Sequence, residues 1–257
     1  MALTSRVLEI EEHALSAWPA AESEAVAGWC LRAMSGVSRR ANSVWTGRAT
    51  GTSSLEQRIA HAESFYRSRS LVPSFQISTH AQPSGLDAAL AARGYQLVSP
   101  VSVQTALPGD VARASTSSNV RAEVEQRMSE TWFELSARRG RFAQVEDVYR
   151  GLLTRLSTRA SFAIAFIDDC PAAVGLGVGG ARWFGISSMF TLPEFRGQGA
   201  ARAVLRALAA HALERGETLY LQVERENQAA LALYSSVGFT HHHTYHYRQA
   251  ARESANG

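Results

Sequence analysis

The 257-residue sequence contains no lysine, so all 26 of its basic residues are arginines. Without a lysine amine the chain cannot form a Schiff base with a carbonyl substrate, and it cannot carry an acyl group on a lysine side chain. It also cannot complete a Walker phosphate loop, which requires Gly-Lys-Ser/Thr. Several classes of covalent and nucleotide chemistry are therefore excluded.

Cysteine is scarce, with only Cys30 and Cys170 far apart and outside any CxxC spacing. This excludes a disulfide framework and gives no zinc site. We expect both residues to be packed thiols and the chain to bind no metal.

Long apolar runs and blocks of one charge are also missing. No run reaches the roughly 18 residues of a membrane span, and Glu9, Glu11 and Glu12 interrupt any signal-peptide pattern. The 26 basic residues are interleaved with 23 acids, for a net charge of +3. We therefore expect a cytoplasmic protein with neither a membrane nor a nucleic-acid partner.

A short, small and polar stretch at 109–119 divides the chain into two segments that each contain strand and helix patterns. We interpret it as a linker between domains at 1–108 and 120–257. In the second domain the patterns predict the order ααβββαβαβ, an α/β (α+β) fold. The predicted elements are helices at 120–136 and 145–157, a hairpin of 161–167 with 172–179, a strand at 183–191, a helix at 200–214, a strand at 219–223, a helix at 227–236 and a strand at 239–248.

The first domain repeats the end of the second in a weaker form. The strand pattern at 74–78 resembles that at 220–224, and the helix pattern at 86–95 resembles that at 229–239. Such self-similarity indicates a duplication. The segment at 47–52, before a predicted helix at 53–69, lacks the ordered arginine, glycines and small residues of its counterpart at 196–201. We predict that the first copy is degenerate and has lost its ligand site.

The counterpart loop joins a strand directly to a helix N-terminus, where unpaired N–H groups and the helix dipole attract anions. Two glycines let phosphate oxygens approach the backbone, and two alanines keep the first helical turn narrow. The loop is Arg196-Gly197-Gln198-Gly199-Ala200-Ala201. By itself the pattern equally fits a plain strand-to-helix turn.

A second block follows the loop and decides between these interpretations: Asn227, Ala230, Tyr234 and Gly238-Phe239 at fixed spacing. Loop and block together, over about 120–248, resemble the GNAT superfamily of N-acetyltransferases. The whole chain is similar to tandem GNAT proteins. The resemblance implies two tandem GNAT-like halves, a GNAT fold with a splayed mixed sheet, and acetyl-CoA as cosubstrate in the split of the sheet.

The resemblance also implies roles for individual residues. The loop would hold the pyrophosphate of the coenzyme, the strand end Met189-Phe190-Thr191 would lie beside its pantetheine arm, and Asn227 would bind that arm. Tyr234 matches the tyrosine that protonates or stabilises the leaving thiolate. The position that is glutamate in ribosomal-protein N-terminal acetyltransferases is Gln222 here, so Glu224, on the same strand face, is the nearest candidate base.

Other residues are weaker candidates. Trp132, Phe133 and Arg141 fall where GNAT helices cover an acceptor, but for the two aromatics we favour a role in core packing. His241, His242, His243 and His246 alternate between strand faces, which argues against a metal cluster; one of them could line the acceptor site.

The function predicted from sequence is acetyl transfer to a primary amine of a small molecule, peptide or protein, by direct attack in a ternary complex. The chain is expected to be a monomer or a homodimer. The alternative is a regulatory module that binds coenzyme A with little turnover, because Gln222 cannot accept a proton.

Overall fold

The computed structural model describes residues 2–115, 119–140 and 142–251. The chain forms two compact units, the first unit of Met1–Ser102 with His243–Gly257 and the second unit of Val103–His242. The chain leaves the first unit within strand β5 (Gln96–Ala106) and re-enters it within strand β11 (Thr240–Gln249). The first unit therefore contains residues from both ends of the described chain, whereas the second unit is one continuous segment.

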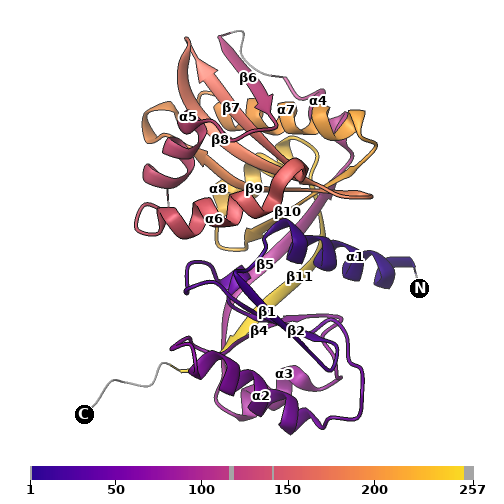
Figure 1. Cartoon of the computed structure of the whole chain (residues 1–257). Helices are drawn as coiled ribbons and strands as arrows, with labels where there is room; N and C mark the ends of the chain where they lie inside the picture. Colours follow the sequence, from indigo (N-terminus) through magenta and orange to yellow (C-terminus); the bar gives the residue numbers. More distant parts are fainter. Residues whose placement is uncertain (1, 116–118, 141, 252–257) are drawn as a thin grey trace. The chain divides into compact units, whose positions relative to one another are not determined.

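The second unit is built on a mixed sheet in the order β5-β10-β9-β8-β7-β6 (Figure 1). Strands β6 to β9 pair antiparallel, whereas β9 and β10 are parallel. The elements of this unit are α4 (Pro108–Ala112), β6 (Val120–Glu125), α5 (Glu130–Phe133), the π-helical turn η2 (Glu134–Arg138), α6 (Glu146–Leu156), the 3-10 turn η3 (Ser157–Arg159), β7 (Ala160–Ile167), β8 (Cys170–Gly179), β9 (Trp183–Thr191), the 3-10 turn η4 (Pro193–Phe195), α7 (Ala200–Glu214), β10 (Thr218–Glu224) and α8 (Gln228–Ser236).

Both faces of this sheet are covered, and β7 shows how the sequence achieves it. Its side chains alternate between faces: Ala163 and Ala165 join the core beneath α7, whereas Phe162 makes an edge contact with Trp132 of α5 at 5.0 Å. A strand buried on both sides needs a nearly continuous apolar sequence, and β7 reads Ala-Ser-Phe-Ala-Ile-Ala-Phe-Ile. The predicted hairpin is confirmed, with Asp168 and Asp169 both at positive φ in its turn.

The predicted helix at 120–136 is wrong in its first half. Val120–Glu125 is strand β6, paired antiparallel with β7 in the register Val120↔Ile167 to Glu125↔Phe162. Val120, Ala122 and Val124 alternate with charged residues, and their burial alternates in the same way. A spacing of four residues fits the strand period of two as well as the helix period of 3.6, which is why the helical interpretation failed.

The predicted linker is also partly structured, because α4 occupies its first residues and packs on α7. Pro108 stands in the first turn, where its missing N–H costs nothing, and Val111 is fully buried. Residues 116–118 lie outside the described residues. The division at 102/103 and 242/243 thus differs from the predicted boundaries at 108 and 120, and the assignment of a degenerate and a catalytic domain remains a prediction.

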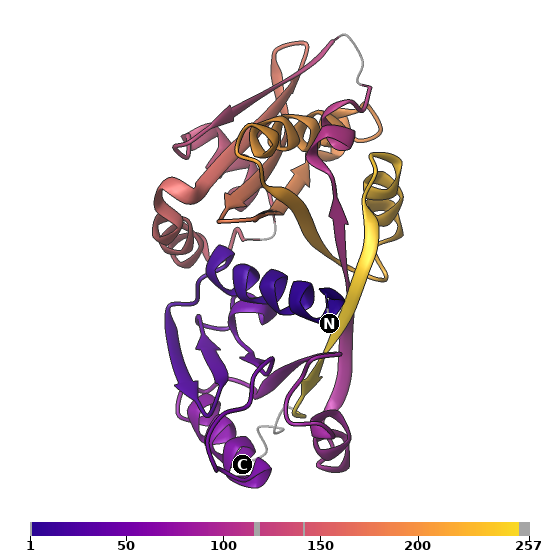
Figure 2. The same ribbon diagram turned by 90° about the vertical axis from the view of Figure 1, so that its right-hand side faces the viewer.

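The first unit has a sheet in the order β1-β2-β3-β4-β11-β5 (Figure 2). Strand β11 pairs antiparallel with β4, from Tyr245↔Ser78 to Gln249↔Ser74. Helices α2 and α3 bury one face around Phe75, Tyr66 and Leu90. The remaining elements are α1 (Ala2–Ala17), β1 (Glu22–Val26), β2 (Trp29–Ala33), the 3-10 turn η1 (Arg39–Ala41), β3 (Val44–Trp45), α2 (Leu55–Arg67), β4 (Ser74–Ser78) and α3 (Leu86–Ala92).

The repeat inferred from the sequence corresponds to repeated structure. Strand β4, helix α3 and strand β5 follow one another in the first half of the chain as β10, α8 and β11 do in the second. The strand-to-helix connections at 47–54 and 192–199 precede α2 and α7 in the same way. The α/β class with a mixed sheet is therefore confirmed, and this order of elements is consistent with two similar halves.

The two cysteines differ in exposure. Cys30 is half-buried on β2, and burial raises the pKa of its thiol. Cys170 is exposed, because it directly follows the hairpin turn at the start of β8. The expectation that both thiols are packed is wrong for Cys170.

Candidate active site

The loop at 196–201 connects η4 to α7 and leaves the N-terminus of the helix open. Gly199 is the N-cap residue, with φ 91° and no side-chain capping bond. Gly197 also has positive φ, at 76°. A Cβ added at either glycine would meet no atom within 4 Å. Uncapped N–H groups facing open space form the arrangement that binds a phosphate.

The other loop residues support this geometry. The side chain of Gln198 points back along the loop, where its Nε2 donates to the carbonyl oxygen of Glu194 at 2.9 Å. Arg196 is exposed and has no carboxylate partner among the described residues. Ala200 is buried beneath the first turn, while Ala201 is half-buried. The loop therefore presents one unpaired guanidinium and a narrow helix end to solvent.

Strands β9 and β10 separate beside this loop. Their parallel pairing runs from Trp183↔Thr218 to Ile186↔Leu221 and ends there. The ends of the two strands thus diverge, which is the splay that the sequence predicted. Met189, Phe190 and Thr191, the residues predicted to lie beside pantetheine, come after Ile186, where the pairing of β9 with β10 ends, and are half-buried.

A β-bulge re-aims side chains in the diverging part of β9. Val174 pairs with Phe190 and Leu176 with Ser187, so β9 has one extra residue. Ser188 lies in this bulge with φ 50°. Bulges of this kind occur next to active sites, where they redirect a side chain. The bulge is a feature that sequence reasoning missed.

The hydroxyl of Ser188 is held by a buried tyrosine. Tyr149 of α6 donates its hydroxyl hydrogen bond to Ser188 Oγ at 2.8 Å. Its ring is stacked on Phe142 at 4.0 Å and lies 6.1 Å from Phe133. The sequence signal available was the polar pair Ser187-Ser188, which interrupts an otherwise apolar strand.

The second motif block lies on α8. Asn227 caps this helix, with Oδ1 accepting from the Ala230 N–H at 3.1 Å, and its amide Nδ2 has no partner among the residues described. Tyr234 is 8% exposed, and burial raises its pKa to about 12. Its ring lies 5.9 Å from that of Phe239. No described residue hydrogen-bonds the phenol oxygen, so this group is free to donate to a ligand.

The base candidate occupies a different environment. Glu224 ends β10 and is exposed, whereas Gln222, two residues earlier, is half-buried. The loop at 196–201 and the divergence of β9 from β10 thus both lie in the second unit, and Glu224 is the exposed last residue of β10. Its role as a base remains a prediction.

The acceptor candidates divide in the same way. Trp132 is fully buried and donates its Nε1 hydrogen to the carbonyl oxygen of Gly175 at 3.1 Å, and Phe133 is equally buried. Both therefore act in core packing. Arg141 lies outside the described residues. Within the described ranges, no group of three His, Cys, Asp or Glu residues could hold a metal ion.

The histidines of β11 have separate surroundings. His243 is buried in the first unit, with Nε2 3.8 Å from Glu11 Oε1. His246 lies 2.9 Å from Asp87 Oδ1, in a cluster shared with Arg248. His241 is exposed. The alternation predicted from the sequence therefore distributes these side chains among different partners.

The equivalent helix start in the first unit is closed. Ser54 caps α2 by accepting from the Gln57 N–H, while Gln57 Oε1 accepts from the Ser54 N–H. The buried Arg58 guanidinium donates to the carbonyl oxygens of Ser53, Thr50 and Ala27. Unlike α7, this helix has a side-chain cap, in which the Ser54 hydroxyl accepts from the N–H of Gln57 in the first turn.

Comparison with known proteins places the chain in a family. Residues 4–248 match the family described as "Probable histone acetyltransferase Rv0428c C-terminal". The chain is also 34% identical to an uncharacterized N-acetyltransferase, YobR, of Bacillus subtilis, over 94% of this chain and 98% of that protein. The chain belongs to the GNAT family of N-acetyltransferases. GNAT acetyltransferases are acyltransferases that use acetyl-CoA as cosubstrate and an amine as acceptor.

Solved GNAT structures share the fold. A GCN5-related N-acetyltransferase from Kribbella flavida superposes with a TM-score of 0.71 over 95% of each chain at 13% identity. A tandem GNAT protein from the clavulanic acid biosynthesis pathway superposes with a TM-score of 0.60, over 77% of this GNAT chain and 69% of that protein, at 15% identity. These likenesses show that the chain shares its fold with solved GNAT proteins, one of which is a tandem GNAT protein.

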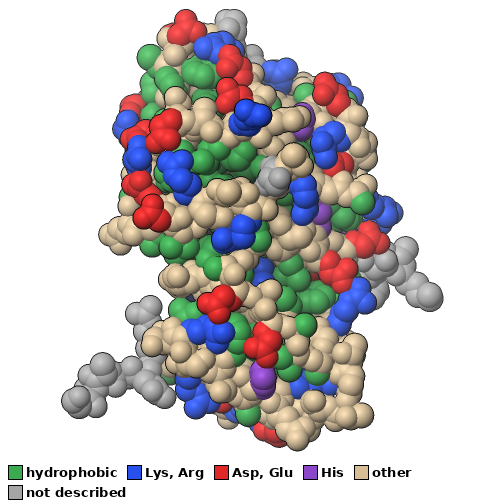
Figure 3. All heavy atoms as spheres, viewed as in Figure 1, with side chains coloured by type: hydrophobic (Ala, Val, Ile, Leu, Met, Phe, Trp, Pro, Cys, Tyr) green, Lys and Arg blue, Asp and Glu red, His purple; other side chains and the backbone are tan. Residues whose placement is uncertain are grey.

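No helix in the described ranges is both long and apolar enough to cross a bilayer. On the face shown in Figure 3, arginines and acidic residues are interspersed rather than gathered by sign.

Proposed function

We propose that this GNAT protein transfers the acetyl group of acetyl-CoA to a primary amine by direct attack in a ternary complex, at a single site in the second unit. The supporting observation is the open N-terminus of α7, with Gly197 and Gly199 at positive φ and free space above both. The amine belongs to a small molecule, a peptide or a protein.

The coenzyme would be held by backbone groups rather than by a charged cluster. The first N–H groups of α7 face the pyrophosphate position, and Arg196 adds a positive charge that no described carboxylate neutralises. Asn227 has an amide Nδ2 left over from its capping bond for the pantetheine arm. The part of β9 beyond Ile186, including Met189, is not paired with β10 and would provide a free strand edge beside that arm.

The chemistry requires one bond to form and one to break. The amine nitrogen attacks the thioester carbonyl, the C–N bond forms, and collapse of the tetrahedral species breaks the C–S bond. One proton leaves the nitrogen, and the thiolate gains one. Holding amine and thioester together accounts for much of the rate, because the reaction becomes effectively unimolecular.

Tyr234 is suited to one of these proton steps in a specific way. Its pKa of about 12 keeps the phenol protonated at neutral pH. Since a thiol has a pKa of about 8.5, full proton transfer from this phenol to the thiolate is uphill. Tyr234 therefore acts by hydrogen-bonding the developing thiolate, which stabilises its charge, and solvent supplies the final proton. Glu224 would accept the amine proton, directly or through water.

The closed helix start of the first unit supports a single site per chain. The capping box of Ser54 and Gln57 and the bonds of Arg58 occupy the positions where a phosphate would bind. We therefore propose that the first half is a degenerate copy that contributes structure but no coenzyme site.

The acceptor panel follows from the family. Because the matched family is named for a probable histone acetyltransferase, a lysine-containing histone-tail peptide belongs in the panel beside small primary amines and peptide N-termini. The assay measures release of coenzyme A thiol with each acceptor, together with acetyl-CoA binding by calorimetry.

The outcomes separate the two functions inferred from the sequence. Thiol release that depends on one acceptor, with a matching mass increase of that acceptor, supports the acetyltransferase. Tight binding of acetyl-CoA without turnover on any acceptor would instead support a coenzyme-binding regulatory module.

A further inference from the structure

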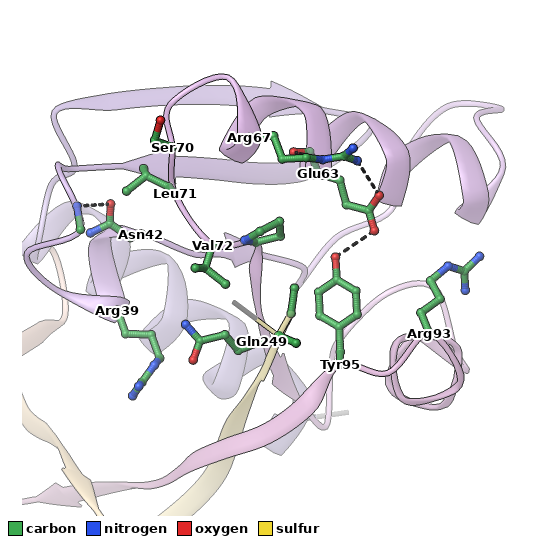
Figure 4. Close-up of a pocket in the computed structure, with 14 residues that line it drawn as sticks. Arg39, Asn42, Glu63, Arg67, Ser70, Leu71, Val72, Arg93, Tyr95 and Gln249 are labelled. Atoms are coloured by element: carbon green, nitrogen blue, oxygen red, sulfur yellow. Dashed lines mark hydrogen bonds and ion pairs between the residues drawn. The ribbon is translucent and has the colours of Figure 1, made fainter. Parts of the chain in front are cut away.

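The first unit contains a cavity that the proposed reaction does not use. It has a volume of about 960 Å³, within the range of about 300–1,000 Å³ typical of small-molecule sites. It lies between the end of α2, the start of β4 and the end of β11 (Figure 4). The phosphate loop of α7 contributes no residue to its lining.

One side of this cavity is charged but internally neutralised. Glu63 accepts a hydrogen bond from Arg67 Nη2 and another from the Tyr95 hydroxyl, each at 2.9 Å (Figure 4). Arg93 is paired with Glu56. Arg67 and Arg93 are thus each paired with a carboxylate, so this side of the cavity has little net attraction for an anion.

Arg39 is different, because no carboxylate among the described residues pairs with it. Its Nη1 donates to Ser99 Oγ, and its guanidinium lies 5.5 Å from the centroid of the Tyr247 ring. The other guanidinium nitrogens of Arg39 have no hydrogen-bond partner in the described chain. This half-buried cation therefore lines the cavity with donors to spare.

Two further arginines near Arg39, Arg32 and Arg40, add positive charge, but neither lines the cavity. Arg32 is 3% exposed, and its Nε and Nη1 have no hydrogen-bond partner. Its one bond goes to the carbonyl oxygen of Arg40, which itself lies over the Trp18 ring. Neither is paired with a described acid. Three neighbouring arginines without a carboxylate create a positive potential that an anion would relieve.

The remaining lining defines what kind of anion fits. Gln249 follows Tyr247 by two residues on β11, so it projects on the same face as the ring beneath Arg39. Its amide is a second donor, and no side chain in the described ranges forms a hydrogen bond with it. Leu71, Val72 and Pro73 form an apolar wall. One fork-shaped cation, one amide and an apolar wall match a carboxylate on an apolar body.

We propose that the first unit binds a small organic carboxylate in this cavity, with the carboxylate on Arg39 and Gln249 and its carbon body on Leu71, Val72 and Pro73. A phosphate dianion fits less well, because Arg67 and Arg93 are already paired. No residue of the proposed coenzyme loop lines this cavity, so the proposal can be tested independently of the proposed acetyl transfer.

Calorimetry on the full chain tests the proposal with benzoate, the neutral isostere benzamide, acetate and inorganic phosphate as probes. We expect benzoate to bind, benzamide and phosphate to bind at least about tenfold more weakly, and acetate to be weak because it lacks an apolar body. Arg39→Met should lower benzoate affinity at least about tenfold, and Arg39→Lys should restore only part of it. Arg6→Met, at an exposed arginine of α1, is the matched control and should change nothing.

A second measurement needs no variant. Phenylglyoxal modifies arginine, and peptide mass mapping should show benzoate protecting Arg39 of the wild-type chain more than Arg6. Gln249→Leu gives an independent variant if Arg39→Met does not fold. Equal binding of benzamide, preference for phosphate, unchanged affinity in both pocket variants or absence of protection at Arg39 would each overturn the proposal.

Discussion

Gly199 and Gly216 provide a matched pair of substitutions at the two ends of α7. Gly199 has φ 91° before the first turn, and Gly216 has φ 70° after the last. A Cβ at either position would meet no protein atom within 4 Å. Replacing either glycine by alanine therefore adds backbone strain without a clash, at a cost of about 1–2 kcal/mol.

The two variants should differ only in coenzyme A binding, because only the open space at Gly199 is predicted to hold the pyrophosphate. Both should lower the melting temperature by about 2–8 °C, as that cost implies for a unit of this size. At Gly199 the added methyl enters the space predicted for the pyrophosphate and displaces the N–H groups that would bind it. Loss of one charge-assisted hydrogen bond weakens coenzyme A binding by about tenfold to a hundredfold.

The assay is calorimetric titration of coenzyme A into wild type, Gly199→Ala and Gly216→Ala, with thermal melts of all three. Gly216→Ala should keep wild-type affinity despite its lower melting temperature. If Gly199→Ala also keeps wild-type affinity, the phosphate loop has been assigned wrongly. If Gly216→Ala loses affinity equally, the effect is one of stability rather than of the loop.

Three further predictions concern single hydroxyl or carboxyl groups. Tyr234→Phe should lower kcat by about a hundredfold with unchanged coenzyme A affinity, because only the bond to the developing thiolate is lost; equal rates would remove Tyr234 from the mechanism. A double-mutant cycle of Tyr149→Phe and Ser188→Ala should give a coupling of about 0.5–1.5 kcal/mol in urea unfolding, and additive effects would show that their 2.8 Å hydrogen bond contributes nothing. Burial raises the pKa of Glu11 above the 4.5 of the unfolded chain, so its contribution to stability is fully present below pH 4.5 and is lost as the pH rises through the folded value. The free energy of unfolding of Glu11→Gln, measured relative to that of wild type, should therefore be higher at pH 8 than at pH 5. A constant difference between the two proteins across this interval would contradict the buried carboxyl.

The elements from residue 160 onward could be predicted from sequence because each has one strong period and a marked end. The helix at 200–214 starts after Gly199 and ends before Gly216, and the structure gives the same bounds. The splay of β9 and β10 was reached through family resemblance, and the pairing that stops at Ile186 and Leu221 confirms it.

The elements and contacts that the sequence did not predict share one cause, which is that tertiary packing determines them. The spacing of Val120 and Val124 fits both the helix period and the strand period. Only the pairing with β7 makes this segment a strand. Val111 is one apolar residue in a polar stretch, yet its burial fixes α4. The bond between Tyr149 and Ser188 joins positions 39 residues apart, which no local pattern reveals.

The candidate site was predictable in its backbone part and less so in its side chains. Glycine spacing reports directly on φ and open space, so Gly197 and Gly199 could be read from the sequence. The surroundings of a titratable group depend on folding, so neither the burial of Tyr234 nor the exposure of Glu224 was readable in advance.

The pairing of β11 with β4 determines when the first unit can be completed during synthesis. Tyr245 and Gln249 pair with Ser78 and Ser74, which are roughly 170 residues earlier in the chain. Until residues 245–249 have left the ribosome, β4 keeps an unpaired strand edge that can associate with another chain. A nascent or C-terminally truncated chain that lacks β11 should therefore depend on chaperones and aggregate readily.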